Sequence, residues 1–159
     1  MIKRYTLPEM GAVWSEQSKL NNWLQIEVAA CEAWAQLGRI PAASVETIKA
    51  RACFDVTRIA EIEAEVRHDV IAFLTNVGEY VGDDAKYIHL GMTSSDILDT
   101  GIAMQMRDSA DLILAKLEKL QVAIRKKAIQ YKYTLCIGRT HGVHGEPTTF
   151  GLKMALWYT

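Results

Sequence analysis

The chain has 159 residues, half of them hydrophobic, and a formal net charge of −1 at pH 7. This length fits one domain or a little more, and the balanced charge gives no general attraction to nucleic acid or to an anionic membrane. No run reaches the roughly 18 apolar residues of a membrane span, and the first residues lack the apolar segment of a signal peptide, so we expect a cytoplasmic protein without nucleic-acid or membrane partners.

The first predicted elements are short helices. Between residues 15 and 37, apolar side chains recur at helical spacing, and a glycine and a proline then end the helix. Ser44 is predicted to cap the next helix, and Asp55 the one after it. A further helical pattern covers residues 70–77 and ends at Gly82. Because no segment shows a convincing alternation of period two, the predicted class is all-α.

One long helix is predicted for residues 102–137, which contain neither glycine nor proline. At ~1.5 Å per residue this helix would be about 50 Å long, which is more than a compact domain of this size needs. Its apolar seam repeats at steps of three and four and consists of Ile113, Leu117, Leu120, Ile124, Ala128 and Tyr131. We expect a helical bundle completed by other subunits rather than a coiled-coil spacer, because the seam is short and flanked by polar loops.

The densest group of reactive side chains lies between Arg139 and Gly151. It holds two imidazoles, a carboxylate, an arginine and several hydroxyls among three glycines. Glycine allows the backbone to approach a ligand closely, and histidine exchanges a proton near neutral pH. The run therefore predicts an acid/base site on a shaped loop, after which Pro147 can start a helix.

A zinc site is the alternative for this run. His141 and His144 are three residues apart and Glu146 lies nearby, and all three are possible zinc ligands. The intervening glycines prevent a rigid helical face, and no third ligand has a diagnostic spacing, so we predict no metal. The three cysteines of the chain are far apart without Cys-x-x-Cys spacing, which favours reduced residues over disulfides.

The run from Arg139 to Gly151 resembles the histidine motif of the adenylosuccinate lyase family, in the superfamily of fumarase, aspartase and argininosuccinate lyase. The resemblance covers the whole chain but only the amino-terminal part of the family's length, so we expect a fragment. It implies elimination of fumarate from adenylosuccinate and from succinylated aminoimidazole carboxamide ribotide in purine synthesis. No metal or organic cofactor is expected. Gly145 stands where alanine is common in relatives.

The resemblance also implies roles for the residues of this run. His141 is the expected general acid, which protonates the departing nitrogen, and Thr140 is expected to bind the substrate. The family's base is a serine on a mobile signature loop beyond Thr159, and the carboxylate that pairs with the histidine lies there too. The family forms homotetramers whose active sites draw on several subunits, so a chain of this length is expected to be inactive alone.

Two further clusters match family motifs, and each has a simpler alternative. Arg67, His68 and Asp69 follow a helical pattern and alone would indicate a salt-bridged surface. In the family the matching residues contact the nucleotide, and we include His68 as a second catalytic candidate. His89 lies between two apolar residues, so a buried structural histidine is the alternative to the active-site histidine that the family has here.

Two binding clusters complete the set. Thr93 and Ser94 precede the long helix, where free backbone amides and hydroxyls can bind an anion. A plain helix cap is the alternative, whereas the family's matching pair binds a carboxylate of the succinyl group. Arg4 and Tyr5 alone would indicate a solvated tail. In the family an Arg-Tyr pair at this place binds the substrate phosphate, for which guanidinium and phenol groups are suitable donors.

We therefore predict an amino-terminal helical domain of residues 1–92, followed in residues 93–159 by the beginning of a central helical bundle. In the expected reaction a base removes the proton beside a carboxylate and a general acid protonates the leaving nitrogen. Two alternatives remain. One is another fumarate-releasing lyase of the superfamily, and the other is a non-catalytic helical interaction module.

Overall fold

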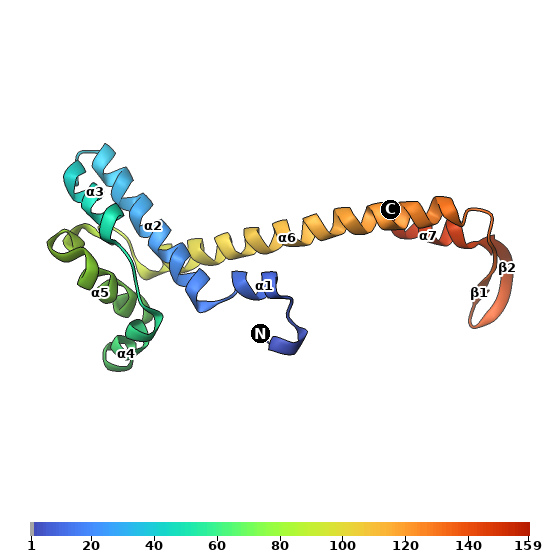
Figure 1. The fold of residues 1–159 in the computed structure, drawn as a ribbon, viewed down its shortest axis with the longest axis horizontal. Coiled ribbons are helices and arrows are strands. Elements are labelled where there is room, and N and C mark those ends of the chain that lie inside the picture. The colour runs from blue at the N-terminus through green and yellow to red at the C-terminus, as the bar shows by residue number, and fades with distance from the viewer. Residues whose placement is uncertain (1) are drawn as a thin grey trace. The chain divides into compact units, whose positions relative to one another are not determined.

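The structure, a computed structural model, describes residues 2–159 except for the side chain of Lys3. Within this range the chain forms seven α-helices, two short 3-10 helices and one two-stranded sheet, which confirms the predicted all-α class. In chain order the elements are η1 Lys3–Tyr5, α1 Pro8–Val13, α2 Glu16–Gln36, α3 Ala42–Arg51, α4 Val56–Val66, α5 Asp69–Val81, η2 Gly82–Tyr87, α6 Ser94–Gln130, β1 Leu135–Thr140, β2 Val143–Thr149 and α7 Phe150–Tyr158 (Figure 1).

The chain forms two compact units, and the boundary between them along the chain lies in α6, between Ser109 and Ala110. The first unit includes the first turns of α6 because their side chains bond to the segment around α1. Trp14 Nε1 donates a hydrogen bond to Ser109 Oγ at 2.9 Å, and Gln105 Nε2 donates to the carbonyl of Val13 at 2.8 Å. A division of the intact protein after residue 92 stays a prediction.

One of the two predicted caps in the first unit is confirmed. Asp55 Oδ1 accepts the backbone N–H of Arg58 at 2.8 Å and so caps α4. The predicted cap at Ser44 is wrong, because α3 begins at Ala42, directly after Pro41. The fixed φ of proline positions the chain for the first turn, which leaves Ser44 buried inside the helix.

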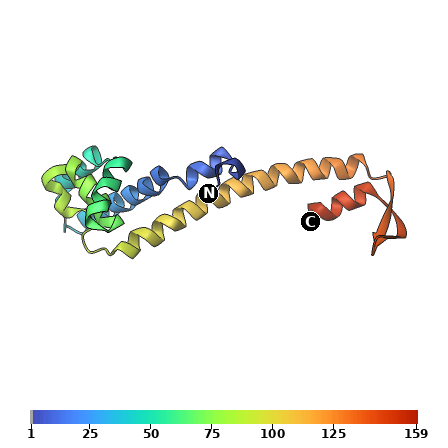
Figure 2. The same ribbon diagram turned by 90° about the horizontal axis from the view of Figure 1, so that it is seen from below.

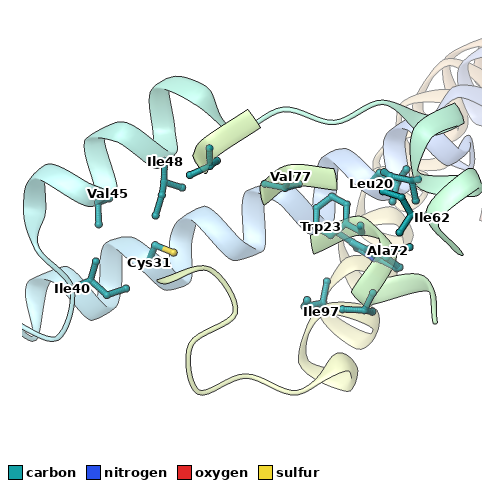
Figure 3. Close-up of a cluster of buried hydrophobic side chains, with 14 residues drawn as sticks. Leu20, Trp23, Cys31, Ile40, Val45, Ile48, Ile62, Ala72, Val77 and Ile97 are labelled. Carbon is teal, nitrogen blue, oxygen red and sulfur yellow. The ribbon is translucent and has the colours of Figure 1, made fainter. Parts of the chain in front are cut away.

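The hydrophobic core of the first unit lies between α2 and the helices around it (Figure 3). Trp23 of α2 meets Phe73 of α5 edge to face, with ring centroids 5.5 Å apart. Gly101 allows α6 to approach the same tryptophan, because a Cβ at this glycine would lie 3.0 Å from the indole ring. The largest fully buried side chains are Trp23, Phe73, Leu20, Ile48, Ile97, Glu27, Val70, Val77, Val81, Asn76 and Cys31. Helix α2 is therefore held by the core along its length, and Glu27 belongs to its buried face.

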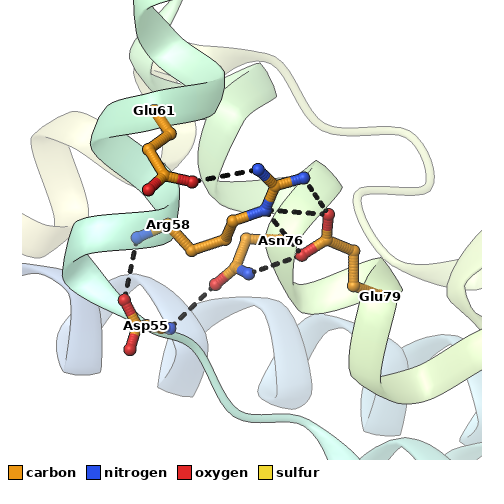
Figure 4. Close-up of polar contacts among 5 residues, drawn as sticks. All are labelled: Asp55, Arg58, Glu61, Asn76 and Glu79. Atoms are coloured by element: carbon orange, nitrogen blue, oxygen red, sulfur yellow. Dashed lines mark hydrogen bonds and ion pairs between the residues drawn. The ribbon is translucent and has the colours of Figure 1, made fainter.

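A polar network joins α4 to α5 (Figure 4). The buried Asn76 accepts the backbone N–H of Asp55 at 2.8 Å and donates to Glu79 at 2.9 Å. Arg58 pairs with Glu79 at 2.9 Å and with Glu61 at 3.1 Å. Hydrogen bonds from Arg58, and then from Asn76, lower the pKa of the Glu79 carboxyl. Its contribution to stability is therefore present above the unfolded-state pKa and is lost as the pH falls through the folded-state pKa.

Substitution Asn76→Ala is expected to lower the free energy of unfolding by about 1–3 kcal/mol, because it removes the buried amide that bonds to both the Asp55 N–H and Glu79. Urea denaturation measures this change. Asn21→Ala is the matched control, since Asn21 is exposed on α2 and bonds only to Gln17 among the contacts seen. This control is expected to change stability by less than about 0.5 kcal/mol. Equal effects of the two substitutions would contradict the role of Asn76.

The run predicted to be a loop is a β-hairpin. Strands β1 and β2 pair antiparallel with Thr140 opposite Val143, so His141 and Gly142 form a two-residue turn. Both turn residues have positive φ, 53° and 74°, which is the requirement of a type I′ hairpin turn. The register of the two strands shifts between Ile137 and Arg139. This shift is a β-bulge, which bends the hairpin.

Two predictions near this hairpin are wrong. The long helix does not reach residue 137, because α6 ends at Gln130 and the following residues, rich in aromatic and β-branched types, favour extended structure. Pro147 does not start a helix either, because it lies in β2 opposite Ile137. A two-stranded sheet tolerates proline because both of its strands are edges. Helix α7 begins at Phe150, where Thr149 Oγ1 accepts the N–H of residue 152 at 3.2 Å.

The first turn of helix α7 lies against the end of α6 within the second unit (Figure 2). The N–H of Phe150 donates to the carbonyl of Thr134 at 2.8 Å, and the N–H of Gly151 donates to that of Tyr131 at 2.9 Å. The rings of Tyr131 and Phe150 meet edge to face at 5.5 Å. These contacts close the base of the hairpin and hold its two strands at the end of α6.

Candidate functional site

His141 lies at the tip of the hairpin, where its side chain is exposed. Thr140 and Arg139 precede it on β1 and are exposed as well, and His144 pairs with Arg139 across the strands. A surface depression of the hairpin is lined by Gly138, Arg139, Thr140, Gly145 and Glu146. The turn thus exposes the His141 imidazole, with the Thr140 hydroxyl and the Arg139 guanidinium on the strand beside it.

The zinc alternative for this hairpin lacks a ligand set within the described chain. Among residues 2–159, no three histidine, cysteine, aspartate or glutamate side chains are grouped so that they could hold a metal ion. His141 is at the tip of the turn, whereas His144 lies further along β2. The expectation that the protein uses no metal or organic cofactor stays a prediction.

His89 lies on the irregular segment between η2 and α6 and is held by α2. Its backbone has φ +67°. Its N–H donates to Glu27 Oε2 at 2.8 Å, and its Nδ1 lies 2.7 Å from Glu27 Oε1. The Glu27 side chain is 1% exposed, and that of His89 is 21% exposed. His89 is therefore not a histidine buried among apolar groups but one member of an acid–imidazole pair near the surface.

Glu27 was not among the residues predicted from the sequence. A signal for it exists, because Glu27 follows Leu20 and Leu24 and precedes Cys31 in steps of four, three and four. These steps place the four residues on one face of a helix. An acidic residue on an apolar helix face is rarely buried without a partner, so the position itself indicated a paired carboxylate.

Thr93 and Ser94 lie where α6 begins. The N–H of Thr93 donates to Asp96 Oδ2 at 2.8 Å, and the N–H of Asp96 donates back to the carbonyl of Thr93 at 3.0 Å. The first turn is therefore capped by a carboxylate. Among residues 2–159 neither hydroxyl has a hydrogen-bond partner, so both remain available. The binding role of this pair stays a prediction.

Arg67, His68 and Asp69 form the corner between α4 and α5. Arg67 ends α4 in the left-handed conformation with φ 57°. His68 caps α5, since its Nδ1 accepts the backbone N–H of Ile71 at 3.3 Å, and it lies 3.6 Å from Asp69 Oδ1. Because Nδ1 faces the helix end, Nε2 is the ring nitrogen left to face other groups. The side chains of His68 and Asp69 are 46% and 45% exposed.

Arg4 and Tyr5 lie on η1, and both are exposed. The guanidinium carbon of Arg4 is 4.8 Å from the centroid of the Tyr5 ring. Within residues 2–159, no hydrogen bond or ion pair joins this pair to the corner at His68 or to the side chains of His89 and Thr93. Within the first unit the candidate residues are thus separate surface groups that do not bond directly to one another.

Comparison with known protein families assigns the chain to a family. A family model described as Lyase matches residues 3–159. The chain belongs to this lyase family. Within the described residues of this lyase chain, no helix has the length and apolar character needed to cross a membrane.

Curated relatives of this lyase chain carry a more specific name. The chain is 63% identical over 157 residues to an adenylosuccinate lyase of Synechocystis sp., covering 99% of the chain and 36% of the relative. It is 48% identical over 158 residues to an adenylosuccinate lyase of Bacillus subtilis, covering 99% of the chain and 37% of the relative. The chain therefore spans little more than a third of the length of these relatives.

Solved structures support the fold of this lyase chain. It superposes on a fumarate lyase from Mesorhizobium sp. BNC1 with a TM-score of 0.89 and 32% sequence identity. The superposition covers 94% of the chain and 36% of that structure. The resemblance noted in the sequence is thus confirmed at the level of the family and the fold.

Proposed function

We propose that the protein to which this chain belongs is an adenylosuccinate lyase, which releases fumarate from adenylosuccinate to give AMP. It would also act on succinylated aminoimidazole carboxamide ribotide in purine biosynthesis. The observation that carries the proposal is the 63% identity to an adenylosuccinate lyase over 157 residues. The exposed His141, presented by a two-residue turn, supports it, because a general acid must reach the leaving atom of a substrate. A cytoplasmic location is part of the same proposal.

In this proposal His141 protonates the nitrogen that leaves, and Thr140 binds the substrate beside it. Thr93 and Ser94 bind a carboxylate of the succinyl group. Charge that develops on that carboxylate is stabilised by fixed hydrogen-bond donors, which contribute most when water is excluded. The hairpin tip is exposed within this chain. In this proposal the serine base, and the segments that exclude water from the site, belong to the longer protein.

A homotetramer with shared active sites belongs to the same proposal. Ile113, Leu117 and Leu120 of the apolar seam are 51%, 48% and 53% exposed on α6. Exposed apolar residues that repeat along a helix are typical of a surface covered by partner helices. Helices from other subunits would bury this seam and bring further chains to the hairpin.

A fumarate-release assay tests the proposed function. We expect the longer protein, with the part that its relatives have beyond this chain, to release fumarate from adenylosuccinate at an enzymatic rate. The 159-residue chain alone is expected to show no release above the uncatalysed control, because the serine base is expected outside it. Activity of this chain alone would show that the base is misassigned. Absence of activity in the longer protein would favour a helical interaction module or another lyase.

Arg4→Ala in the longer protein is expected to weaken the binding of adenylosuccinate about 10-fold or more, because a charge-assisted contact with the phosphate is lost. The succinyl nucleoside that lacks the phosphate should bind with unchanged affinity. Steady-state kinetics with both compounds measures the difference. Arg39→Ala is a control, since this arginine lies in the turn after α2. Equal losses for the two compounds would remove Arg4 from the phosphate site.

A further inference from the structure

The buried face of α2 holds the segment that carries His89. Three side chains of this face, Glu27, Cys31 and Trp34, are spaced at i, i+4 and i+7 and therefore point the same way. Trp34 Nε1 donates to the carbonyl of Leu90 at 2.7 Å. Cys31 Sγ lies 3.6 Å from the carbonyl of Tyr87, as a thiol donor. The segment from residue 87 to 90 is thus bound at three successive points to one rigid helix.

The thiol in this row stays neutral. Burial, followed by the nearby carboxylates of Glu27 and Glu32, raises the pKa of the Cys31 thiol to about 11. A neutral thiol donates a hydrogen bond and carries no charge to balance a carboxylate. The charge of Glu27 must therefore be balanced by another group.

His89 is the group that contacts the Glu27 carboxylate. Both carboxylate oxygens are occupied by His89, one by its backbone N–H at 2.8 Å and one by Nδ1 at 2.7 Å. A carboxylate that is 1% exposed is costly without a charged or hydrogen-bonded partner. When the imidazole is protonated it neutralises this carboxylate, and Nε2–H is left as a donor. Among residues 2–159, Nε2 has no hydrogen-bond partner.

The backbone of His89 indicates that this arrangement is imposed on the residue. A non-glycine residue at φ +67° is uncommon and is retained when the surroundings determine it. Gly91 follows in the same turn, and a Cβ there would lie 3.1 Å from the Trp34 ring. The turn is therefore pressed against α2, and the direction of the His89 ring follows from that contact.

We propose that Glu27 is the positioning residue of His89, which it orients as a cationic donor, through Nε2–H, to an anionic oxygen of the substrate. This inference rests on the proposed function, because adenylosuccinate supplies the anion, as a phosphate or a carboxylate. Glu27 itself is too deeply buried to touch the substrate. Glu27 affects substrate binding only through the His89 ring. In many functional histidines a carboxylate bonds to one ring nitrogen and so determines how the other nitrogen faces its partner.

The kinetic test uses Glu27→Gln in the longer protein. The glutamine side chain keeps the size and one acceptor oxygen but removes the charge. We expect the KM for adenylosuccinate to rise 10-fold to 100-fold, while kcat changes by less than about threefold. Glu32→Gln is the matched control, since Glu32 lies on the same helix but pairs with Lys49 at 2.8 Å. This control should leave both constants unchanged. A lower kcat at constant KM would overturn the proposal.

A double-mutant cycle tests whether Glu27 acts through the ring. His89→Gln alone should raise KM, and adding Glu27→Gln to it should raise KM no further, because the group that Glu27 orients is gone. Independent, multiplicative effects of the two substitutions would overturn the proposal. The phosphate-free succinyl nucleoside identifies the anion. If the effect of Glu27→Gln disappears with it, Nε2–H binds the phosphate, and if the effect persists, it binds a carboxylate.

A chemical measurement keeps the inference separate from the proposed function. Diethyl pyrocarbonate modifies unprotonated imidazole nitrogens, and peptide mass spectrometry follows each histidine of the unliganded longer protein. His89 should react several-fold faster in Glu27→Gln than in the wild type, with His68 as internal reference. An equal or slower rate would overturn the pairing, whatever the substrate of the enzyme is. If Glu27→Gln does not fold, Glu27→Asp keeps the charge and should give a smaller change in the same direction, whereas an unchanged rate overturns the proposal.

Discussion

Replacement of His141 by glutamine in the longer protein is expected to reduce turnover of adenylosuccinate by about 10²–10⁴-fold, the usual contribution of a general acid. This loss corresponds to roughly 3–5 kcal/mol of activation barrier. The KM should stay within severalfold, because glutamine keeps hydrogen-bonding atoms at the tip of the hairpin. Steady-state kinetics measures both constants. The positive φ of His141 is 53°, which glutamine must also adopt, so thermal unfolding of the variant is measured alongside.

His144→Gln is the matched control for this substitution. His144 lies on the same hairpin but on β2, where it pairs with Arg139 rather than forming the turn. A substrate whose nitrogen leaves without needing a proton should restore turnover in the His141 variant and have no such effect in the His144 variant. Near-normal turnover of the His141 variant, or rescue confined to the His144 variant, would move the acid role to the second histidine.

The helical part of the fold could be predicted because its signals are local. The cap at Asp55 and the helix that ends at Gly82 both depend on residues within one or two turns, and both are observed. The hairpin was missed because its strands contain glycines and lack an apolar face, so no alternation of period two marks them. A type I′ turn usually has asparagine, aspartate or glycine at its first position, and His141 occupies that place here.

The candidate site was predictable only in part, for a similar reason. The histidines lie in motifs that are continuous in sequence, so they could be selected without a structure. The partner of His89 is Glu27, 62 residues earlier in the chain. Such a pair depends on the packing of α2 against the segment before α6. The exposure of the hairpin tip likewise depends on tertiary structure, which the sequence motif alone does not reveal.

Gly151→Ala is expected to lower the stability of the second unit by about 1–3 kcal/mol or more, because a methyl group has no room there. A Cβ at Gly151 would contact the Cα of Lys132 and would lie 2.5 Å from the carbonyl oxygen of Ala128 and 2.6 Å from the backbone nitrogen of Lys132. All three contacts are backbone atoms, which cannot rotate away as the end of a side chain can. Relief requires α7 to move away from the end of α6. Thermal unfolding measures the loss.

Gly78→Ala is the matched control, because it makes the same substitution inside α5. Its Cβ would lie 3.5 Å from that of Ala85, an ordinary contact, and alanine in a helix interior is favoured over glycine by roughly 0.5–1 kcal/mol. The two substitutions should therefore change stability in opposite directions. In the longer protein Gly151→Ala should also reduce turnover, since the glycine closes the base of the hairpin that carries His141. A Gly151 variant as stable and as active as the wild type would show that α7 does not position this hairpin.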